Sequence, residues 1–250
     1  MRELIINADD FGFTRDVNDG IVRAHREGVL TSTTLMANGA AFDHAVALAH
    51  ATPRLDVGVH LVLVQGTSLL TGKPLPNSPA KLPLALLSLD LEAEMRAQIQ
   101  KVIAAGIHPT HLDTHKHTHL IPQVFRTAAR LAGEFGIPYL RLPLVAAPFF
   151  KRLARPYPVS FTQHLIGFRL TGSLTEQTFG QALANLPDGL SEFMCHPGLL
   201  TAELAAAPTR LKESRVRELE ALISPRIHTL LNDSGVRLRG FSPPFQSPFR

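Results

Sequence analysis

The sequence predicts an α/β fold: a single-domain (β/α) barrel, distorted and TIM-like, with about seven parallel strands. Short β-rich runs alternate with amphipathic helical windows along nearly the whole chain. Such alternation indicates a parallel sheet with right-handed crossovers. The chain has 250 residues, 45% of them hydrophobic, which is enough for one core of barrel size. An open doubly wound sheet is the alternative, although no Gly-x-Gly-x-x-Gly motif follows the first strand.

The expected elements alternate in order along the chain. The runs with strand composition are Glu3–Asn7, Thr31–Met36, Asp56–His60, Thr110–Thr114, Tyr139–Leu142, Ser191–Cys195 and Gly235–Arg239. The windows with helical apolar spacing are Asp16–Glu27, Phe42–His50, Leu91–Ala105, Pro122–Phe135, Leu174–Leu186 and Thr209–Leu231. Gly28, Gly106 and Gly136 stand where helix C-terminal caps are expected, each ahead of the next strand.

Three segments fall outside this alternation. Residues 64–90 contain four prolines, and a segment of this length is expected to form an active-site loop. Residues 143–169 lack a clear pattern, but Phe149–Arg152 sets aromatic side chains beside Lys and Arg. That combination suits a membrane interface or a lipid-bearing substrate, and it suits a basic cap over an ordinary core equally well. Residues 240–250, with their Ser-Pro steps, are expected to form an extended C-terminal tail.

Charge and composition narrow the expected partners and location. The net charge is +4 with only 18% charged residues, and no Lys/Arg block is long enough to follow a phosphate backbone, so nucleic acid is not expected. The first strand starts at Glu3, which leaves no room for a signal peptide, and no run of 18 apolar residues exists. We expect a cytoplasmic protein; peripheral contact with the inner face of the membrane and oligomerisation stay open. The single cysteine, Cys195, excludes an internal disulfide.

The segment from Thr110 to His119 has a functional side chain at every second position. On an extended chain these side chains share one face, which a buried strand would otherwise fill with Val, Ile or Leu. The five residues concerned are His111, Asp113, His115, His117 and His119. Because the rise along a strand is about 3.3 Å per residue, only one or two of them can meet at one ion. Further ligands must therefore come from other strands.

Polar side chains recur at the carboxyl ends of the predicted strands. Taken singly, each has an ordinary explanation, such as a helix cap for the aspartates or an ion pair for Arg141. In a parallel barrel, however, all these ends form one face, where catalytic groups gather. The residues so placed are Asp9, Asp10, His60, Asp113, His115, Arg141 and His196. We therefore expect these residues, far apart in sequence, to converge on one site.

The residue types indicate metal-assisted hydrolysis. A carboxylate with two imidazoles and an open position for water is a catalytic ligand set for Zn²⁺ or a similar divalent ion. A second carboxylate can take the proton of the water, and a more distant histidine can protonate the leaving group. Asp9 and Asp10 are neighbours at a strand end, so they can divide metal binding and base catalysis between them. No Gly-x-Ser-x-Gly elbow offers a serine nucleophile.

Several of these motifs together resemble the YdjC-like carbohydrate deacetylases. They are Asn7–Gly12, Thr31–Thr34, Val57–Leu61, Pro109–His119 and Cys195–Pro197, and their order matches that family. The resemblance implies a barrel of the glycoside hydrolase/deacetylase type and removal of an acetyl group from an N-acetylated sugar. It also implies one divalent metal ion held by Asp10, His60 and His115, with Asp9 as general base.

The remaining roles follow as hypotheses from this mechanism. His196 is the expected acid for the departing amine, and Arg141 or Asp113 orients Asp9 or a ligand histidine. Asn38 and His117 are expected, like Asp113, to contact substrate or support the site. Zn²⁺ and Mg²⁺ are the foremost metals, and Mn²⁺, Co²⁺ or Ni²⁺ would accept the same ligands.

The chain also resembles one branch of this family, the branch associated with hopanoid biosynthesis. The resemblance rests on Pro138–Pro143 and Phe149–Arg152 and implies an N-acetylglucosaminyl hopanoid lipid as substrate. The chain has no Trp and two Tyr, so it lacks an obvious aromatic platform for a long glycan, although its 14 Phe offer contact surface. A chitooligosaccharide is the alternative substrate.

Two other functions stay open at this stage. A metal-dependent phosphoesterase would favour two metal ions about 3.5–4 Å apart, with His117 and His119 as additional ligands. A catalytically silent protein that binds metal or sugar would show binding without product. The adjacent Asp9 argues against silent binding, because a binding protein has no need of a base beside its metal ligand.

Overall fold

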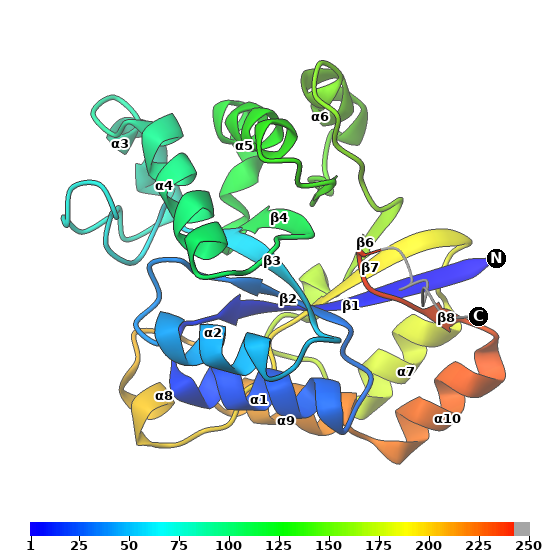
Figure 1. Ribbon diagram of the computed structural model, residues 1–250. Coiled ribbons are helices and arrows are strands. Elements are labelled where there is room, and N and C mark those ends of the chain that lie inside the picture. Colours follow the sequence, from blue (N-terminus) through cyan, green and yellow to red (C-terminus); the bar gives the residue numbers. More distant parts are fainter. Residues whose placement is uncertain (243–250) are drawn as a thin grey trace.

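Seven parallel strands form a single curled sheet, which confirms the predicted α/β barrel class (Figure 1). The computed structural model describes residues 1–242. The strands are β1 (Arg2–Phe11), β2 (Ser32–Leu35), β3 (Asp56–Leu61), β4 (His111–Thr114), β5 (Tyr139–Leu140), β6 (His164–Ile166) and β7 (Gly189–Cys195). Their spatial order is β5-β4-β3-β2-β1-β7-β6, and a short eighth strand, β8 (Arg237–Leu238), pairs with the start of β1.

β1 lies at the centre of the sheet and is buried from Leu4 to Phe11. It pairs with β2 on one side and with β7 on the other, so Ala8 has Thr33 and Cys195 as neighbours. Strands buried on both faces need apolar residues throughout, which explains the run Leu-Ile-Ile in β1. The pairing of β1 with β2 shifts register between Ala8 and Phe11, at the two aspartates of the predicted site.

The two edges of the sheet approach each other through the segment that precedes β6. The backbone of Ser160 accepts a hydrogen bond from Leu140 N at 3.0 Å and donates one to Pro138 O at 2.8 Å. Three residues later, Gln163 N donates to the backbone oxygen of Leu190 in β7. This segment therefore spans from β5 to β7, and the curled sheet comes close to a closed barrel.

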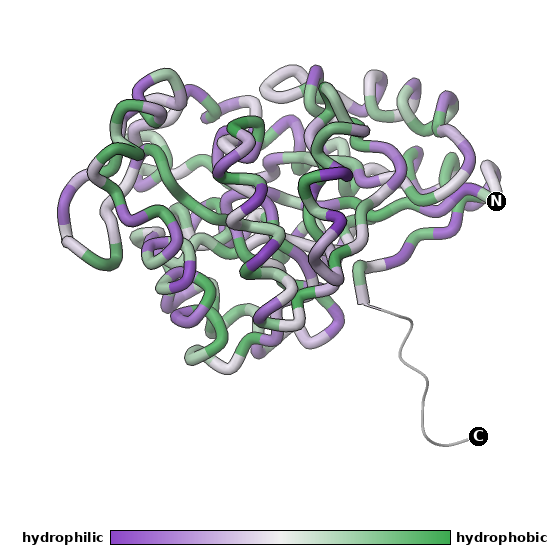
Figure 2. The backbone as a smooth tube through the Cα atoms, turned by 90° about the horizontal axis from the view of Figure 1, so that it is seen from above, coloured by the Kyte–Doolittle hydropathy of each residue, from purple (hydrophilic) through white to green (hydrophobic). Residues whose placement is uncertain are grey.

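Helices cover the outside of the curled sheet (Figure 1). The longer ones are α1 (Arg15–Arg26), α2 (Phe42–His50), α4 (Leu91–Ala104), α5 (Pro122–Glu134), α6 (Ala147–Ala154), α7 (Glu176–Ala184), α9 (Glu213–Leu222) and α10 (Pro225–Ser234). Shorter ones are α3 (Leu82–Ala85) and α8 (Ala202–Ala206). Green and purple alternate along the helical turns in Figure 2, as expected for helices with one apolar face.

The structure differs from the sequence prediction in three places. The window Thr209–Leu231 is two helices, because Pro225 starts a new helix with Ser224 as its N-cap. Residues 143–169, which showed no clear pattern, contain α6 and β6. Residues 64–90 are mostly irregular, as expected of a loop, but contain a short helix, α3, near their end. No helix in residues 1–242 is long and apolar enough to cross a membrane.

The chain after β8 packs against the first residues of β3 and β4, at the amino ends of these strands. The ring of Phe241 is 3% exposed and stacks on His111 with centroids 3.8 Å apart. Ser242 N donates to the carboxylate of Asp56 at the start of β3. Of the tail expected at residues 240–250, residues 243–250 lie outside the described part of the chain.

Candidate active site

A cavity of about 1290 Å³ opens at the carboxyl ends of the strands. Its walls include seven of the residues expected there: Asp9, Asp10, Asn38, His60, His115, His117 and His196. Two others, Asp113 and Arg141, do not line the cavity but are fully buried behind it, where they contact residues of its wall. The structure therefore gathers all nine predicted residues at one end of the sheet.

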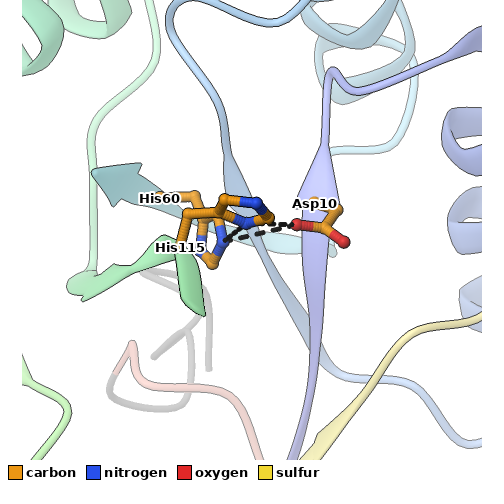
Figure 3. Close-up of side chains that lie close together, drawn as sticks. All are labelled: Asp10, His60 and His115. Carbon is orange, nitrogen blue, oxygen red and sulfur yellow. Dashed lines mark hydrogen bonds and ion pairs between the residues drawn. The ribbon is translucent and has the colours of Figure 1, made fainter. Parts of the chain in front are cut away.

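Asp10, His60 and His115 point toward one another from β1, β3 and the turn after β4 (Figure 3). Oδ1 of Asp10 lies 3.1 Å from Nδ1 of His115 and 3.4 Å from Nε2 of His60. The two imidazole nitrogens are 3.3 Å apart. These three atoms form a nearly regular triangle that opens toward the cavity.

This triangle fits a divalent metal ion. Ligand atoms that bind one ion tetrahedrally at about 2.0–2.2 Å lie roughly 3.3–3.6 Å from one another, close to the distances found here. Oδ1 of Asp10 is buried and has no well-directed hydrogen bond from any described residue, which is costly unless a cation is bound there. One carboxylate and two imidazoles are also a donor set that Zn²⁺ and similar ions accept.

The ring of His60 is fixed by its second nitrogen. Nδ1 lies 2.6 Å from Oδ1 of Asp113, and Thr34 Oγ1 donates to the other oxygen of Asp113 at 3.1 Å. With Nδ1–H directed at Asp113, Nε2 presents its lone pair to Asp10 and His115. Burial would lower the pKa of His60, but the charges of Asp113 and Asp10 outweigh it and raise the pKa to about 10. A proton and a metal ion therefore compete for Nε2.

Asp10 is aimed by its backbone and by Arg215. Its φ is +72°, in the left-handed region that few residues other than glycine adopt. This geometry lets Asp10 and its neighbour Asp9 face the same cavity, although successive strand residues normally point to opposite faces. Nη2 of Arg215 lies 2.5 Å from Oδ2 of Asp10. Burial raises the pKa of Asp10, yet the charge of Arg215 and contacts with His115 hold it well below its usual range.

Asp9 is held by Arg141. Nη1 and Nη2 of Arg141 donate to the two carboxylate oxygens at 2.9 and 2.8 Å, the bidentate pairing that a guanidinium prefers. Burial alone would raise the pKa of Asp9, but Arg141 holds it below its usual range, so Asp9 is ionised at neutral pH. Nε2 of His196 lies 3.9 Å from Oδ2 of Asp9 on the cavity side.

Arg141 joins three carboxylates in the interior of the barrel. Besides Asp9 it contacts Oδ2 of Asp113 at 2.9 Å and Oε1 of Glu192 at 2.6 Å. Glu192 lies on β7 and is 1% exposed, and its Oε2 has no hydrogen-bond partner among the described residues. Burial raises the pKa of Glu192 to about 7, against the opposing effect of Arg141. Arg141 thereby links Asp9 to Asp113 and, through Asp113, to His60.

The expectation of one extended run from Thr110 to His119 is wrong beyond Thr114. β4 ends there, and residues 115–120 form a tight turn in which Lys116 and His117 have φ near +52°. The turn separates the five alternating side chains. His111 bonds to Asn7 below the cavity, and His119 bonds to Thr114 Oγ1 at 2.7 Å. Only His115 and His117 of the five line the cavity.

His117 stands beside the metal triangle without joining it. Burial and the charge of Arg141 lower its pKa to about 3, so its ring is neutral. The ring lies edge-on to Phe168 with centroids 4.7 Å apart. Within residues 1–242, neither His117 nor His119 belongs to a group of three converging metal-ligand side chains. A second group of possible ligands does converge, Asp9, His60 and Asp113, but the guanidinium of Arg141 contacts both of its carboxylates and disfavours a second cation there. The two histidines expected as additional ligands of a two-metal phosphoesterase therefore do not take that position.

Asn38 and residues 65–67 of the long segment after β3 form part of the cavity wall. Nδ2 of Asn38 donates to Thr67 O at 3.0 Å, while its Oδ1 is buried and has no partner among the described residues. The same segment is anchored from behind by Glu94 on α4. The buried carboxylate of Glu94 accepts hydrogen bonds from Ser68 Oγ at 2.6 Å and Leu69 N at 3.0 Å. This part of the expected loop is thus a fixed cavity wall.

A second, apolar groove of about 550 Å³ adjoins the cavity. His117, Phe168 and Arg169 line both, so they form the partition between them. The groove is otherwise mainly aliphatic: Leu120, Leu144, Val145, Leu165, Ile166, Gly167 and Leu170, with His119. Leu144 is 47% exposed and Val145 is 62% exposed, so apolar surface faces solvent at the rim.

Sequence reasoning missed three charged residues of this site: Arg215, Glu192 and Glu218. Glu192 could have been identified from the sequence, because a glutamate within a strand buried on both faces needs a partner. Arg215 and Glu218 could not, since a helix rich in Glu and Arg normally exposes these residues to solvent.

The chain matches the family model of YdjC-like proteins over residues 3–233. It is 36% identical to a carbohydrate deacetylase of Brevibacillus brevis, over 96% of this chain and 98% of that protein. It is 34% identical to a chitooligosaccharide deacetylase of Klebsiella pneumoniae, over 95% and 97% of the two chains. A solved structure from Enterococcus faecalis V583, named as a candidate cellobiose-phosphate cleavage protein, superimposes with a TM-score of 0.84. It is 27% identical and covers 96% of this chain and 97% of its own. The chain therefore belongs to the YdjC-like family.

Proposed function

We propose that this protein is a metal-dependent hydrolase that removes the N-acetyl group from an N-acetylated amino sugar. The observation that carries the proposal is the triangle of Asp10, His60 and His115, with the ionised carboxylate of Asp9 beside it in the same cavity. The relatives from Brevibacillus brevis and Klebsiella pneumoniae, named as carbohydrate and chitooligosaccharide deacetylases, support the same reaction.

The residues divide the chemistry as follows. A divalent ion bound by the three side chains would acidify a water molecule and polarise the acetamide carbonyl. Asp9 would accept a proton from the attacking water while the oxygen of that water bonds to the acyl carbon. His196, whose Nε2 lies 3.9 Å from Oδ2 of Asp9, donates a proton to the amine nitrogen as the C–N bond breaks. The products are acetate and the free amino sugar.

Arg141 and Asp113 support these groups from behind. The paired hydrogen bonds of Arg141 fix both oxygens of Asp9, so the carboxylate needs no reorientation when it accepts the proton. Asp113 fixes the ring of His60 through Nδ1. Asn38 would bind a sugar hydroxyl through Oδ1, which has no partner among the described residues and can accept a hydrogen bond.

We infer further that the sugar is carried on a lipid, and an N-acetylglucosaminyl hopanoid is the specific proposal. The support is the apolar groove that shares His117, Phe168 and Arg169 with the cavity, because an apolar aglycone could lie there while the sugar occupies the cavity. The exposed Leu144 and Val145 at its rim would gain from such burial. A chitooligosaccharide would need only the cavity.

Acetate release tests both levels of the proposal. The purified protein is incubated with an N-acetylglucosaminyl lipid and, in parallel, with chitobiose, each with and without a chelator. Chelator-sensitive release from the lipid alone is the expected result. Release from chitobiose alone would keep the deacetylase and discard the lipid. Release from neither, with metal bound, would overturn the deacetylase in favour of phosphoester hydrolysis or silent binding.

A groove variant separates the two substrates. Val145→Ser removes apolar surface at the rim of the groove, away from the metal ligands, so KM should rise for the lipid-linked sugar and stay unchanged for chitobiose. An equal change for both substrates would contradict a lipid in the groove. Leu87→Ser is a matched control, since Leu87 is 83% exposed and does not line the groove.

A further inference from the structure

One helix carries two buried charges that contact two different parts of the candidate site. Arg215 and Glu218 lie three residues apart on α9, so they share one helix face, and each is 1% exposed. The other buried residues of this helix are small or aliphatic: Ser214, Leu219, Ala221 and Leu222. Two buried charges are costly where aliphatic residues would pack well, so a contribution to stability alone does not explain them.

Arg215 reaches the metal-binding side. Its Nη2 contacts Oδ2 of Asp10 at 2.5 Å, which leaves Oδ1 directed at His60 and His115. The guanidinium is itself oriented, since Nε donates to Leu211 O at 3.3 Å. Without this contact, Oδ2 of Asp10 would be a buried, unpaired oxygen, and the carboxylate would be free to turn.

Glu218 contacts the segment that follows β7. Its Oε2 accepts the backbone N–H of His196 at 2.6 Å, and its Oε1 accepts that of Gly172 at 3.3 Å. The turn after His196 is also held by α9, because Gly198 N donates to the backbone oxygen of Arg215. The position of the His196 backbone therefore depends on α9 in the same way as the carboxylate of Asp10.

We propose that Arg215 and Glu218 are positioning residues with separate effects: Arg215 sets the geometry of the metal-binding carboxylate, and Glu218 sets the position of the proton donor His196. The roles of Asp10 and His196 in this inference rest on the proposed function. Arg215 then acts on metal affinity, whereas Glu218 acts on the step that expels the amine and leaves metal affinity unchanged.

Zn²⁺ affinity of the metal-free protein tests the first half. Competition with a chromophoric chelator should give a 10–100-fold weaker Kd for Arg215→Met, as is usual when a partner of a metal ligand is lost. Arg215→Lys keeps the positive charge but lacks the planar guanidinium with its fixed N–H directions, so it should also weaken Zn²⁺ binding. Glu218→Gln and the exposed control Arg217→Met should stay within about twofold of the wild type. A Kd for both Arg215 variants within twofold of the wild type, or tighter, would overturn the assignment.

The amide resonances of His196 and Gly172 test the second half without turnover. A short hydrogen bond to a carboxylate shifts an amide proton downfield, so Glu218→Gln should move the His196 resonance upfield, and the Gly172 resonance, whose hydrogen bond is longer, by less. In acetate-release assays the same variant should lower kcat while KM stays unchanged. Glu220→Gln, on the exposed face of α9, is the control for both. An unmoved His196 amide, or Zn²⁺ affinity lost with Glu218→Gln, would overturn the separation.

Neither the Kd nor the amide shifts depend on deacetylation. Failure of the wild-type protein to release acetate would therefore remove the proposed function and leave the two contacts of α9 measurable. Circular dichroism spectra establish that each variant is folded before its Kd is compared. Should Arg215→Met not fold, Arg215→Lys carries the Zn²⁺ test alone.

Discussion

Nδ1 of His60 and Oδ1 of Asp113 lie 2.6 Å apart in the interior of the barrel, and this contact determines which nitrogen of His60 faces the cavity. The residues are paired in register on adjacent strands, β3 and β4. Neighbouring parallel strands thus supply a candidate ligand and the carboxylate that orients it.

Replacing Asp113 with Asn should weaken metal binding. An amide holds the imidazole less firmly than a carboxylate and gives it less basicity, so we expect metal affinity to fall about 10–100-fold while the fold is retained. Isothermal titration of the metal-free variant with Zn²⁺ measures the change. Unchanged affinity would show that the 2.6 Å contact does not govern His60.

Replacing Asp9 with Asn should remove turnover and leave metal binding intact. An amide cannot accept the proton of water, and loss of a general base costs about 10²–10⁴-fold in rate. Metal content after purification and acetate release are measured together. Loss of metal in this variant would mean that the roles of Asp9 and Asp10 are exchanged.

Glu192 should make stability depend on pH. Burial raises its pKa to about 7, above the ordinary 4.5, so folding favours its protonated form. Its contribution is fully present below pH 4.5 and is lost as pH rises through about 7. The side chain introduced by Glu192→Gln would stay neutral at every pH. The free energy of unfolding of this variant relative to that of the wild type should therefore increase from pH 5 to pH 8. Urea unfolding of both proteins at pH 5 and at pH 8 measures this, and a stability difference that is the same at the two pH values would contradict it.

Replacing Glu94 with Gln should loosen the cavity wall at residues 64–76. The buried carboxylate accepts hydrogen bonds from Ser68 and from the backbone of Leu69, and weakening them should cost about 1–3 kcal/mol of unfolding free energy. Proteolysis should cut this segment sooner than in the wild type. Glu92→Gln on the same helix is the control, because its ion pairs with Arg96 and Arg130 are exposed and contribute little to stability. Equal effects of both variants would refute the anchoring role.

Replacing Gly20 with Ala should destabilise the protein, although alanine is the better helix former by about 1 kcal/mol. A Cβ at Gly20 would lie 2.4 Å from the Cα of Gly198, in the turn after His196, and neither backbone can yield easily. We expect a loss of about 1–3 kcal/mol in thermal or urea unfolding. Gly180→Ala in α7 is the matched control, since its Cβ would meet the ends of the Leu230 and Ile227 side chains, at 3.2 and 4.0 Å, and no backbone atom of another element within 4 Å.

The sequence alone determined the barrel class and the residues that gather at its end. Apolar runs alternate with helical windows, and this local periodicity identifies the strands and helices that the structure contains. Residues at the carboxyl ends of parallel strands must then share one face of the barrel. For that reason Asp9, Asp10, His60, Asp113 and Arg141 could be placed together without knowing a single contact.

Tertiary structure alone decided how these residues are held. The turn at Lys116 and His117 adopts positive φ values that residues other than glycine rarely take, so the alternation of histidines suggested a longer strand than exists. Arg215 lies 205 residues from Asp10, and local periodicity carries no information about a contact at that separation. The sequence does not tell whether a charged residue on a helix is exposed to water or forms a buried ion pair with a carboxylate. Only the packing of the helix in the folded protein decides between the two.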